Sequence, residues 1–193
     1  MARPREFDES EALESAMSVF WRYGYTASSM DRLQTAMGLS KSSLYETFGS
    51  KRELLEGCLV RYQDFLREGP LAPLMQPGAG RAQIEDVFRL TIARAMTPEG
   101  QRGCLVNNCL AELAPHDSDI MEATCGIIGW IESMLQRAVE QGQRDGTITR
   151  REPARALAHM LLNTQSGLNL RAKARPDKTV LEDIVRMTLK LLD

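Results

Sequence analysis

The fold is decided by one short stretch, SSMDRLQTAMGLSKSSLYETFGSKRELL, at residues 28–55. Its apolar residues recur three and four positions apart in two runs, Met30–Met37 and Leu44–Phe48, and this spacing places them on one face of a helix. Gly38 lies between the two runs, where glycine turns the chain without steric cost. The stretch therefore predicts two short helices joined by a tight turn, which is the helix-turn-helix arrangement.

The segments on either side of this stretch also carry helix signals. Asp8 can cap a preceding helix that reaches Tyr23, and Ser40 can cap the second helix of the pair. Ser50 and Glu53 have the spacing of a capping box, which predicts the start of a long helix. We therefore expect a three-helix domain at the N-terminus that is followed directly by a long connecting helix.

The composition favours helices in the rest of the chain. Leu (24) and Ala (19) far outnumber Val (7) and Ile (8), and the first pair prefers helices whereas the second prefers strands. The run GPLAPLMQPGAG at residues 69–80 is rich in proline and glycine, which predicts a loop or hinge. Further helices are expected at 81–96, 103–113, 118–142, 153–174 and 177–192. The prediction is an all-α protein of about nine helices.

The overall composition excludes several classes of protein. A chain of 193 residues with 43% hydrophobic and 26% charged residues fits a globular protein and not a disordered one. It has no apolar window long enough for a membrane span and no signal peptide, so we expect a cytoplasmic protein without a membrane partner. The four cysteines form no C-x-x-C pair, and only two histidines accompany them. No zinc site, cofactor site or catalytic triad is expected, and hence no enzyme.

The charge distribution permits DNA binding only at a local site. The net charge of the chain is -2, whereas nucleic-acid binders often have an excess of Lys and Arg. Residues 28–52 alone carry a net charge of +2. Within them, the small Ser42 and Ser43 would let the second helix approach base edges, and Lys41 and Tyr45 can reach phosphates or bases. A helix that reads the major groove of DNA is the interpretation we favour.

The region from residue 8 to residue 55 resembles the DNA-binding region of the TetR family of bacterial one-component transcriptional regulators. The resemblance is carried by ALESAMSVFWRYGYTASSMDRLQTAMGLSKSSLYETFGSKREL, with Gly-Tyr after the first helix, Met-Gly-Leu-Ser in the turn and Ser-Lys before the fourth helix. It implies a homodimer that binds a palindromic operator through its third helices, usually as a repressor that a small-molecule effector releases. It also implies a DNA-binding domain at 1–52 and an effector-binding and dimerisation domain at 53–193.

The resemblance assigns candidate DNA contacts residue by residue. They are Ser28, Ser29, Lys41, Ser42, Ser43, Tyr45, Glu46, Thr47 and Lys51, the last on a phosphate, with possible arm contacts from Arg3 and Arg5. Two positions depart from the commonest family pattern: Ser42 replaces a frequent glycine, and Glu46 is acidic. A carboxylate near phosphates is unfavourable unless it accepts from a cytosine amino group, so Glu46 puts the base sequence of the operator in doubt.

The second half of the chain would hold the effector pocket and the dimer interface. Candidate pocket residues are Phe65, Phe88, Ile92, Cys104, Asn108, Cys125, Trp130 and Met134, although apolar side chains at these positions could equally be core. The helices at 153–174 and 177–192 are amphipathic and could pair with a second copy of themselves. They could also simply cover the core of one subunit.

Cys104 suggests a possible thiol-based sensor. It follows Arg102 near an expected helix start, where a positive environment lowers a thiol pKa and makes it reactive towards electrophiles or oxidants. Buried packing is the alternative, since free cysteines are often fully buried. A further alternative for the whole chain is an all-helical protein that binds a small molecule and no operator.

Overall fold

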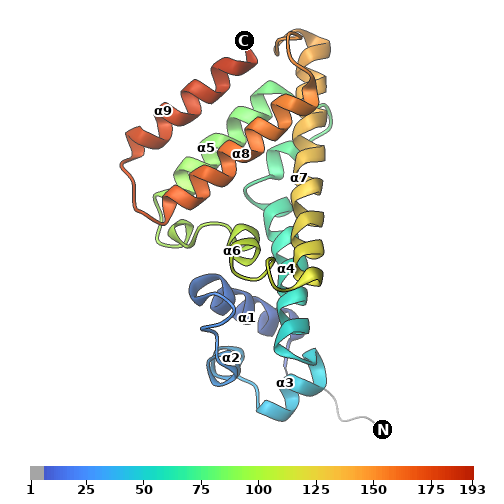
Figure 1. The fold of residues 1–193 in the computed structure, drawn as a ribbon, viewed down its shortest axis with the longest axis vertical. Coiled ribbons are helices and arrows are strands. Elements are labelled where there is room, and N and C mark those ends of the chain that lie inside the picture. The colour runs from blue at the N-terminus through green and yellow to red at the C-terminus, as the bar shows by residue number, and fades with distance from the viewer. Residues whose placement is uncertain (1–6) are drawn as a thin grey trace.

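The computed structural model describes residues 7–193. Over this range the fold is all-α, as predicted, with nine α-helices and three short 3-10 helices (Figure 1). The α-helices are α1 (Glu9–Tyr23), α2 (Met30–Met37), α3 (Lys41–Phe48), α4 (Lys51–Glu68), α5 (Arg81–Ala95), α6 (Leu105–Glu112), α7 (Ser118–Asp145), α8 (Ala154–Ala172) and α9 (Lys178–Leu189). The 3-10 helices are η1 (Ala72–Met75), η2 (Gly100–Arg102) and η3 (Lys190–Leu192). None of the helices in the described range is long and apolar enough to cross a membrane.

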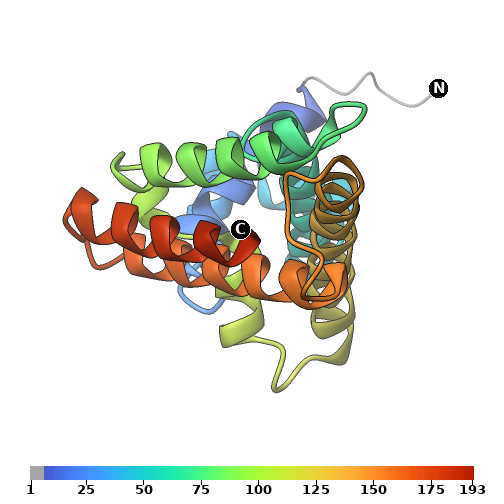
Figure 2. The ribbon, with the colours of Figure 1, turned by 90° about the horizontal axis from the view of Figure 1, so that it is seen from above.

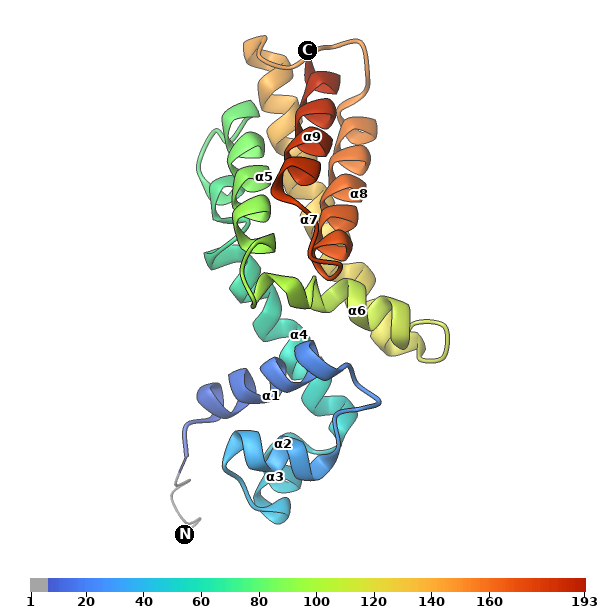
Figure 3. The same cartoon turned by 90° about the vertical axis from the view of Figure 1, so that its left-hand side faces the viewer.

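Helices α1, α2 and α3 form a small bundle at one end of an elongated molecule. Helix α4 begins in this bundle and continues without interruption into the larger helical part (Figures 1 and 3). The small bundle is held by Phe20, Leu33, Leu44 and Leu54, all of which are almost completely buried. The burial of these large apolar side chains contributes most of the stability of this part of the fold.

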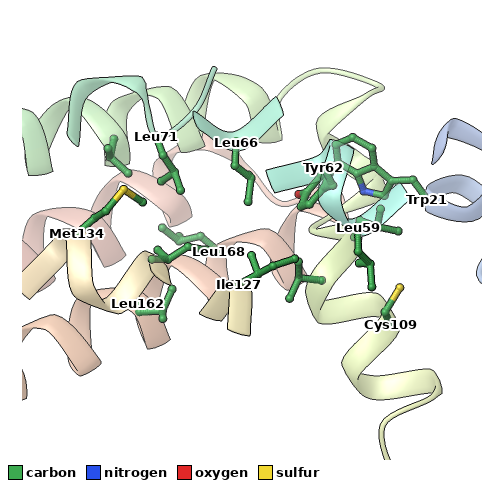
Figure 4. Packing of buried hydrophobic residues seen from close by; sticks show 14 of the residues in the cluster. Trp21, Leu59, Tyr62, Leu66, Leu71, Cys109, Ile127, Met134, Leu162 and Leu168 are labelled. Carbon is green, nitrogen blue, oxygen red and sulfur yellow. The ribbon is translucent and has the colours of Figure 1, made fainter. Parts of the chain in front are cut away.

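The larger part is built around the long helix α7. Figure 2 views α7 nearly along its axis; α5 and α8 contact α7 and each other, and α9 packs against α5 and α8. Helix α6 lies across the molecule between the two parts (Figure 3) and contacts α1, α4 and α7. Buried side chains from α1, α4, α7 and α8 meet near α6 (Figure 4), where the Trp21 ring packs edge-on to Tyr62 at 4.9 Å.

The helix boundaries follow local signals that the sequence carries. The Asp8 carboxylate accepts hydrogen bonds from two backbone amides of the first turn of α1, and the Ser40 hydroxyl accepts one in α3. Ser50 and Glu53 form the predicted capping box of α4. Gly38 ends α2 in the left-handed conformation with φ of 66°, which glycine adopts at little cost. These predicted caps are therefore confirmed.

The proline-rich run at residues 69–80 is only partly the loop that we predicted. Its prolines prevent a continuous α-helix, but they permit the 3-10 turn η1. Leu71 and Leu74 are buried, and η1 packs against α4, α5 and α7. The apolar side chains between the prolines draw the chain onto the core, and the exposed loop is limited to residues 75–78.

Candidate functional site

Helix α3 presents most of its surface to solvent at the end of the molecule opposite the C-terminus (Figure 1). Leu44 is its only buried residue, with no exposed surface, and it anchors the helix against the small bundle. The side chains of Lys41, Ser42, Tyr45 and Glu46 are exposed. A helix that is anchored on one side and polar on the other is the geometry that a major groove accepts.

The N-terminus of α3 is organised by a cluster of serine hydroxyls. The Ser40 Oγ accepts a hydrogen bond of 3.1 Å from the Ser43 backbone amide, and it lies 3.0 Å from the Ser42 Oγ and 2.9 Å from the Ser43 Oγ. The partial positive charge of a helix N-terminus attracts anions. The end of α3 therefore combines small side chains, hydroxyl groups and a positive dipole end.

The positive charges near α3 are less available than the sequence suggested. The Lys51 ammonium lies 4.2 Å from the centre of the Tyr25 ring, and partial burial lowers the pKa of Lys51. The Arg32 guanidinium donates to the Ala27 carbonyl at 3.0 Å. The Arg52 guanidinium is ion-paired with acidic groups at the start of α7, so its charge is not available at the exposed face of α3. The basic character that we assigned to residues 28–52 is therefore reduced by partners far away in the sequence.

The partners of Arg52 include two aspartates. Its Nε lies 3.1 Å from the Asp117 Oδ2, and Asp119 also pairs with its guanidinium. A third contact at 3.6 Å joins Arg52 to Glu56 within α4. These ion pairs connect the start of α4 to the start of α7, and they account for the lowered pKa of Asp119, whose main cause is the hydrogen bond from Arg52.

One of the predicted DNA contacts is wrong, because Ser28 has no exposed surface. Its hydroxyl donates to the Gly24 carbonyl at 2.5 Å and closes the turn between α1 and α2. Ser29 is exposed and caps α2 by accepting from the Arg32 backbone amide. The expected arm contacts of Arg3 and Arg5 lie outside the described residues.

Glu112, at the end of α6, holds the turn between α1 and α2. Its carboxylate accepts from the Tyr25 backbone amide at 2.9 Å and from the Thr26 backbone amide at 2.7 Å. Burial alone would raise the pKa of Glu112, but these hydrogen bonds and the charge of Lys51 lower it overall. Sequence reasoning missed Glu112, since no local pattern indicates which backbone amides a distant carboxylate will meet. We call this contact the Glu112 clamp.

Replacing Gly24 by alanine is expected to disrupt the Glu112 clamp. Gly24 has φ of 77° and ψ of 175°, a conformation that costs other residues about 1–3 kcal/mol. An added Cβ would also lie 2.6 Å from the Glu112 Oε2. Thermal unfolding should show a lower melting temperature for Gly24→Ala. Gly126→Ala is the control, because no other atom lies near a Cβ at this position in α7. Equal melting temperatures for both variants would show that Gly24 is not required for the Glu112 clamp.

A small internal cavity lies in the larger part, among α4, α5, α6, α7 and α8. Its volume is about 40 Å³. The lining residues are Tyr62, Leu66, Pro70, Leu71, Thr91, Arg94, Gly103, Cys104, Val106, Asn107, Ile128, Ile131, Leu162, Gln165, Ser166 and Asn169. A broader open cleft lies next to it, between the end of α1 and helices α6, α7 and α8, and shares part of this lining.

Most of the predicted pocket residues line neither space. Cys104 lines both the cavity and the cleft, and Asn108 lines the cleft alone. Ile92 borders a separate surface groove between α5 and α9. The other five candidates line neither space: Phe88 and Met134 are buried in the core, Phe65 and Trp130 are partly buried against it, and Cys125 is exposed. Apolar character alone does not distinguish the wall of a cavity from a filled core.

Comparison with known proteins gives the family. A sequence model described as "Bacterial regulatory proteins, tetR family" matches residues 12–58, and one described as "Tetracyclin repressor-like, C-terminal domain" matches residues 80–188. The chain belongs to the TetR family. It is therefore a DNA-binding transcriptional regulator and not an enzyme.

TetR-family relatives match the chain along its whole length. It is 30% identical to the uncharacterized HTH-type transcriptional regulator YezE of Bacillus subtilis over 197 residues, which cover 100% of both chains. It is 29% identical to the transcriptional repressor ComR of Escherichia coli, over 98% of this chain and 90% of ComR. Among solved structures, the TetR-family regulator CifR in complex with a 26-bp operator DNA superposes with a TM-score of 0.86 at 30% identity, over 99% of this chain and 100% of that one.

Cys104 of this TetR-family chain lacks the activating environment that we expected. It precedes α6, but the Arg102 guanidinium points to the Ser18 hydroxyl at 3.1 Å instead of to the thiol. Burial raises the pKa of Cys104 despite hydrogen bonding with Tyr62, which lowers it. The prediction of a lowered thiol pKa is thus wrong, because removal from water opposes the thiolate more strongly than nearby donors favour it.

Proposed function

We propose that this protein is a dimeric repressor that binds an inverted-repeat operator through α3 and is released from DNA by a small-molecule effector. The observation that carries the proposal is the exposed polar face of α3, held in a fixed position by the buried Leu44. The operator complex of CifR and the repressor ComR support the same function by similarity.

We assign the reading of bases to the exposed residues of α3. Tyr45 and Glu46 would contact base edges, Ser42 would allow close approach of the backbone, and Lys41 would contact a phosphate. Ser29, Ser43 and Thr47 remain candidate contacts at the margin of this face. Lys51 would need to leave the Tyr25 ring to reach a phosphate, and the loss of this cation–π contact offsets part of its contribution.

We propose that α8 and α9 form the dimer interface. Large apolar side chains are exposed on both helices in one subunit, Met160 and Leu170 on α8 and Met187 on α9, and Leu191 is exposed in the η3 turn that follows α9. An exposed apolar surface of this kind on neighbouring helices typically marks a protein contact. A second copy would cover it and would supply the second α3 that an inverted repeat requires. The proposed domains remain 1–52 for DNA binding and 53–193 for effector binding and dimerisation.

Effector binding would act through α6. One end of this helix borders the internal cavity at Cys104, and the other end carries the Glu112 clamp. A ligand that favours a different position of α6 would change the position of the small bundle relative to the rest of the subunit. Effector and operator would then weaken each other's binding reciprocally.

Selection of bound fragments from a random DNA library tests this function. The purified chain should recover an inverted repeat, and the affinity for the recovered site should fall as salt concentration rises. A Leu170→Glu/Met187→Glu double variant should be monomeric in sedimentation and should lose affinity for the full repeat. Failure of the folded, dimeric protein to enrich any sequence would contradict operator binding and favour an all-helical small-molecule-binding protein instead.

A further inference from the structure

Arg94 places a positive charge at the internal cavity without a matching negative one. It lies in the last turn of α5 and lines the cavity. Its guanidinium carbon lies 4.9 Å from the centre of the Trp21 ring and 4.8 Å from that of Phe65. Among residues 7–193, no carboxylate is within ion-pair distance of this guanidinium, and the charge of Glu99 acts on it only from beyond that distance.

An arginine in this environment remains charged. Partial burial lowers the pKa of Arg94 from its ordinary value, yet guanidinium groups stay protonated in proteins. The two aromatic rings stabilise the charge by cation–π interaction. They supply no acceptor for its N–H groups, and a partly buried charge is stabilised when an acceptor pairs with it. The site is therefore prepared for an anion that accepts hydrogen bonds from the guanidinium.

Further hydrogen-bonding groups of the cavity are also without partners. Gln165 is only 7% exposed, and its side-chain amide bonds to no other group in the described range. The side chains of Asn107 and Ser166, also in the lining, form no hydrogen bond with any described residue. Thr91 differs, because its hydroxyl donates to the Val87 carbonyl at 2.8 Å. Buried amides are normally paired in folded proteins, so unpaired ones at a cavity indicate a ligand or ordered water.

The volume of the cavity limits the size of the ligand, and its apolar wall limits the chemistry of the part of the ligand that lies away from Arg94. A volume of about 40 Å³ is space for about three water molecules. Leu66, Leu71 and Ile131 supply an apolar wall. The wall towards the open cleft is formed by residues common to both spaces, namely Cys104, Asn107, Ile128, Leu162, Ser166 and Asn169. A ligand with a small polar head and a short apolar tail matches these dimensions.

We propose that the effector is a small organic carboxylate, whose carboxylate group pairs with Arg94 and accepts from the Gln165 amide. Planar guanidinium groups bind carboxylates with two parallel hydrogen bonds, which gives both strength and geometric selectivity. The short apolar part of the ligand lies against the leucines and Ile131. This inference rests on the proposed function for the role of the ligand as effector, but the binding site itself does not depend on operator binding.

Calorimetric titration of the full-length protein tests the ligand class. The probes are acetate, propionate and pyruvate, with acetamide and propionamide as uncharged molecules of the same shape. At least one carboxylate should bind, and it should bind at least about tenfold more tightly than its amide, since the loss of one charged hydrogen-bonding pair typically has this effect. Equal binding of acid and amide, or binding of neither, would overturn the proposal.

Substitution of Arg94 locates the site. Arg94→Gln should weaken carboxylate binding at least about tenfold and remove the preference over the amide. Arg89→Gln is the matched control on the same helix, because Arg89 is exposed and pairs with Asp86. This variant should bind the carboxylate as tightly as wild type does. If Arg94→Gln does not fold, Gln165→Leu should still weaken the carboxylate without changing its 1:1 stoichiometry. Unchanged affinity in Arg94→Gln or Gln165→Leu would refute the assignment.

Operator binding, measured separately by fluorescence anisotropy, shows whether the carboxylate site and operator binding by this protein stand or fall independently. Carboxylate binding that depends on Arg94 in a protein without operator affinity would support this site and reject the proposed function. Operator release by uncharged molecules alone would support the proposed function and reject the carboxylate. Release by a carboxylate from wild-type protein, and not from Arg94→Gln, is the result that we expect.

Discussion

Tyr45→Ala is expected to weaken operator binding by at least about thirty-fold while leaving the fold intact. A specific side-chain contact with a base contributes about 1–3 kcal/mol, and a dimer on an inverted repeat loses it twice. Tyr45 is 43% exposed on α3, so its removal creates no buried cavity. Fluorescence anisotropy with the selected operator measures the effect, and circular dichroism checks that the helical content is unchanged.

Two further variants separate the possible causes of such a loss. Tyr45→Phe keeps the ring and removes the hydroxyl, so it shows whether stacking or hydrogen bonding carries the contact. Val60→Ala shortens a side chain that is 64% exposed on α4, outside the reading face, and should bind as wild type does. Operator affinity of Tyr45→Ala within about threefold of wild type would exclude Tyr45 from base reading.

The second large effect is expected from Glu112→Ala, which removes the Glu112 clamp. Two backbone amides lose a charged acceptor, at a total of about 1–3 kcal/mol in the free energy of unfolding, because the carboxylate is partly solvated. Urea unfolding followed by Trp21 fluorescence in a Trp130→Phe background reports on this junction, since the Trp21 indole donates to the Gly103 carbonyl at 3.1 Å. Glu122→Ala, at an exposed position of α7, is the control.

The clamp also predicts how effector release changes. If α6 transmits the effect of the ligand, Glu112→Ala should bind the operator but respond to effector less than wild type does. The lowered pKa of Glu112 means that its contribution is present above the ordinary Glu pKa and disappears as pH falls through the lowered value. Between about pH 6 and 8 the clamp should be constant. An unchanged response to effector in Glu112→Ala would show that coupling takes another route.

Local signals predicted the fold, and contacts distant in sequence determined what was missed. Ser40 and Ser50 cap helices with amides only three residues away, so their roles follow from spacing. The two aspartate partners of Arg52 are 65 and 67 residues away, and Glu112 reaches amides 86 and 87 residues away. Nothing in a short window indicates which distant groups will meet. The loss of available positive charge near α3 was therefore beyond sequence reasoning.

An effector pocket was expected in this half of the chain, but two polar residues of the cavity, Arg94 and Gln165, were missed for a related reason. Arg94 and Gln165 occupy ordinary positions on two amphipathic helices, where long polar side chains usually reach solvent. Only the packing of α5 against α8 brings both residues to one enclosed space. Cys104, by contrast, was among the predicted pocket residues, and the helix start next to Arg102 led us to expect a lowered pKa for its thiol. Burial decides the direction in which the pKa of Cys104 shifts, and the local sequence does not show that the thiol is buried.

Helix α3 is anchored by only two apolar side chains, the buried Leu44 and the partly buried Phe48, and this has an evolutionary consequence. Lys41, Ser42, Tyr45 and Glu46 are exposed, and changes at exposed positions usually alter stability by no more than about 0.5 kcal/mol. A duplicated copy of the gene could therefore acquire a new operator by substitutions in α3 before it lost its ability to fold. The operator sequence that this protein recognises can thus change while its fold stays the same.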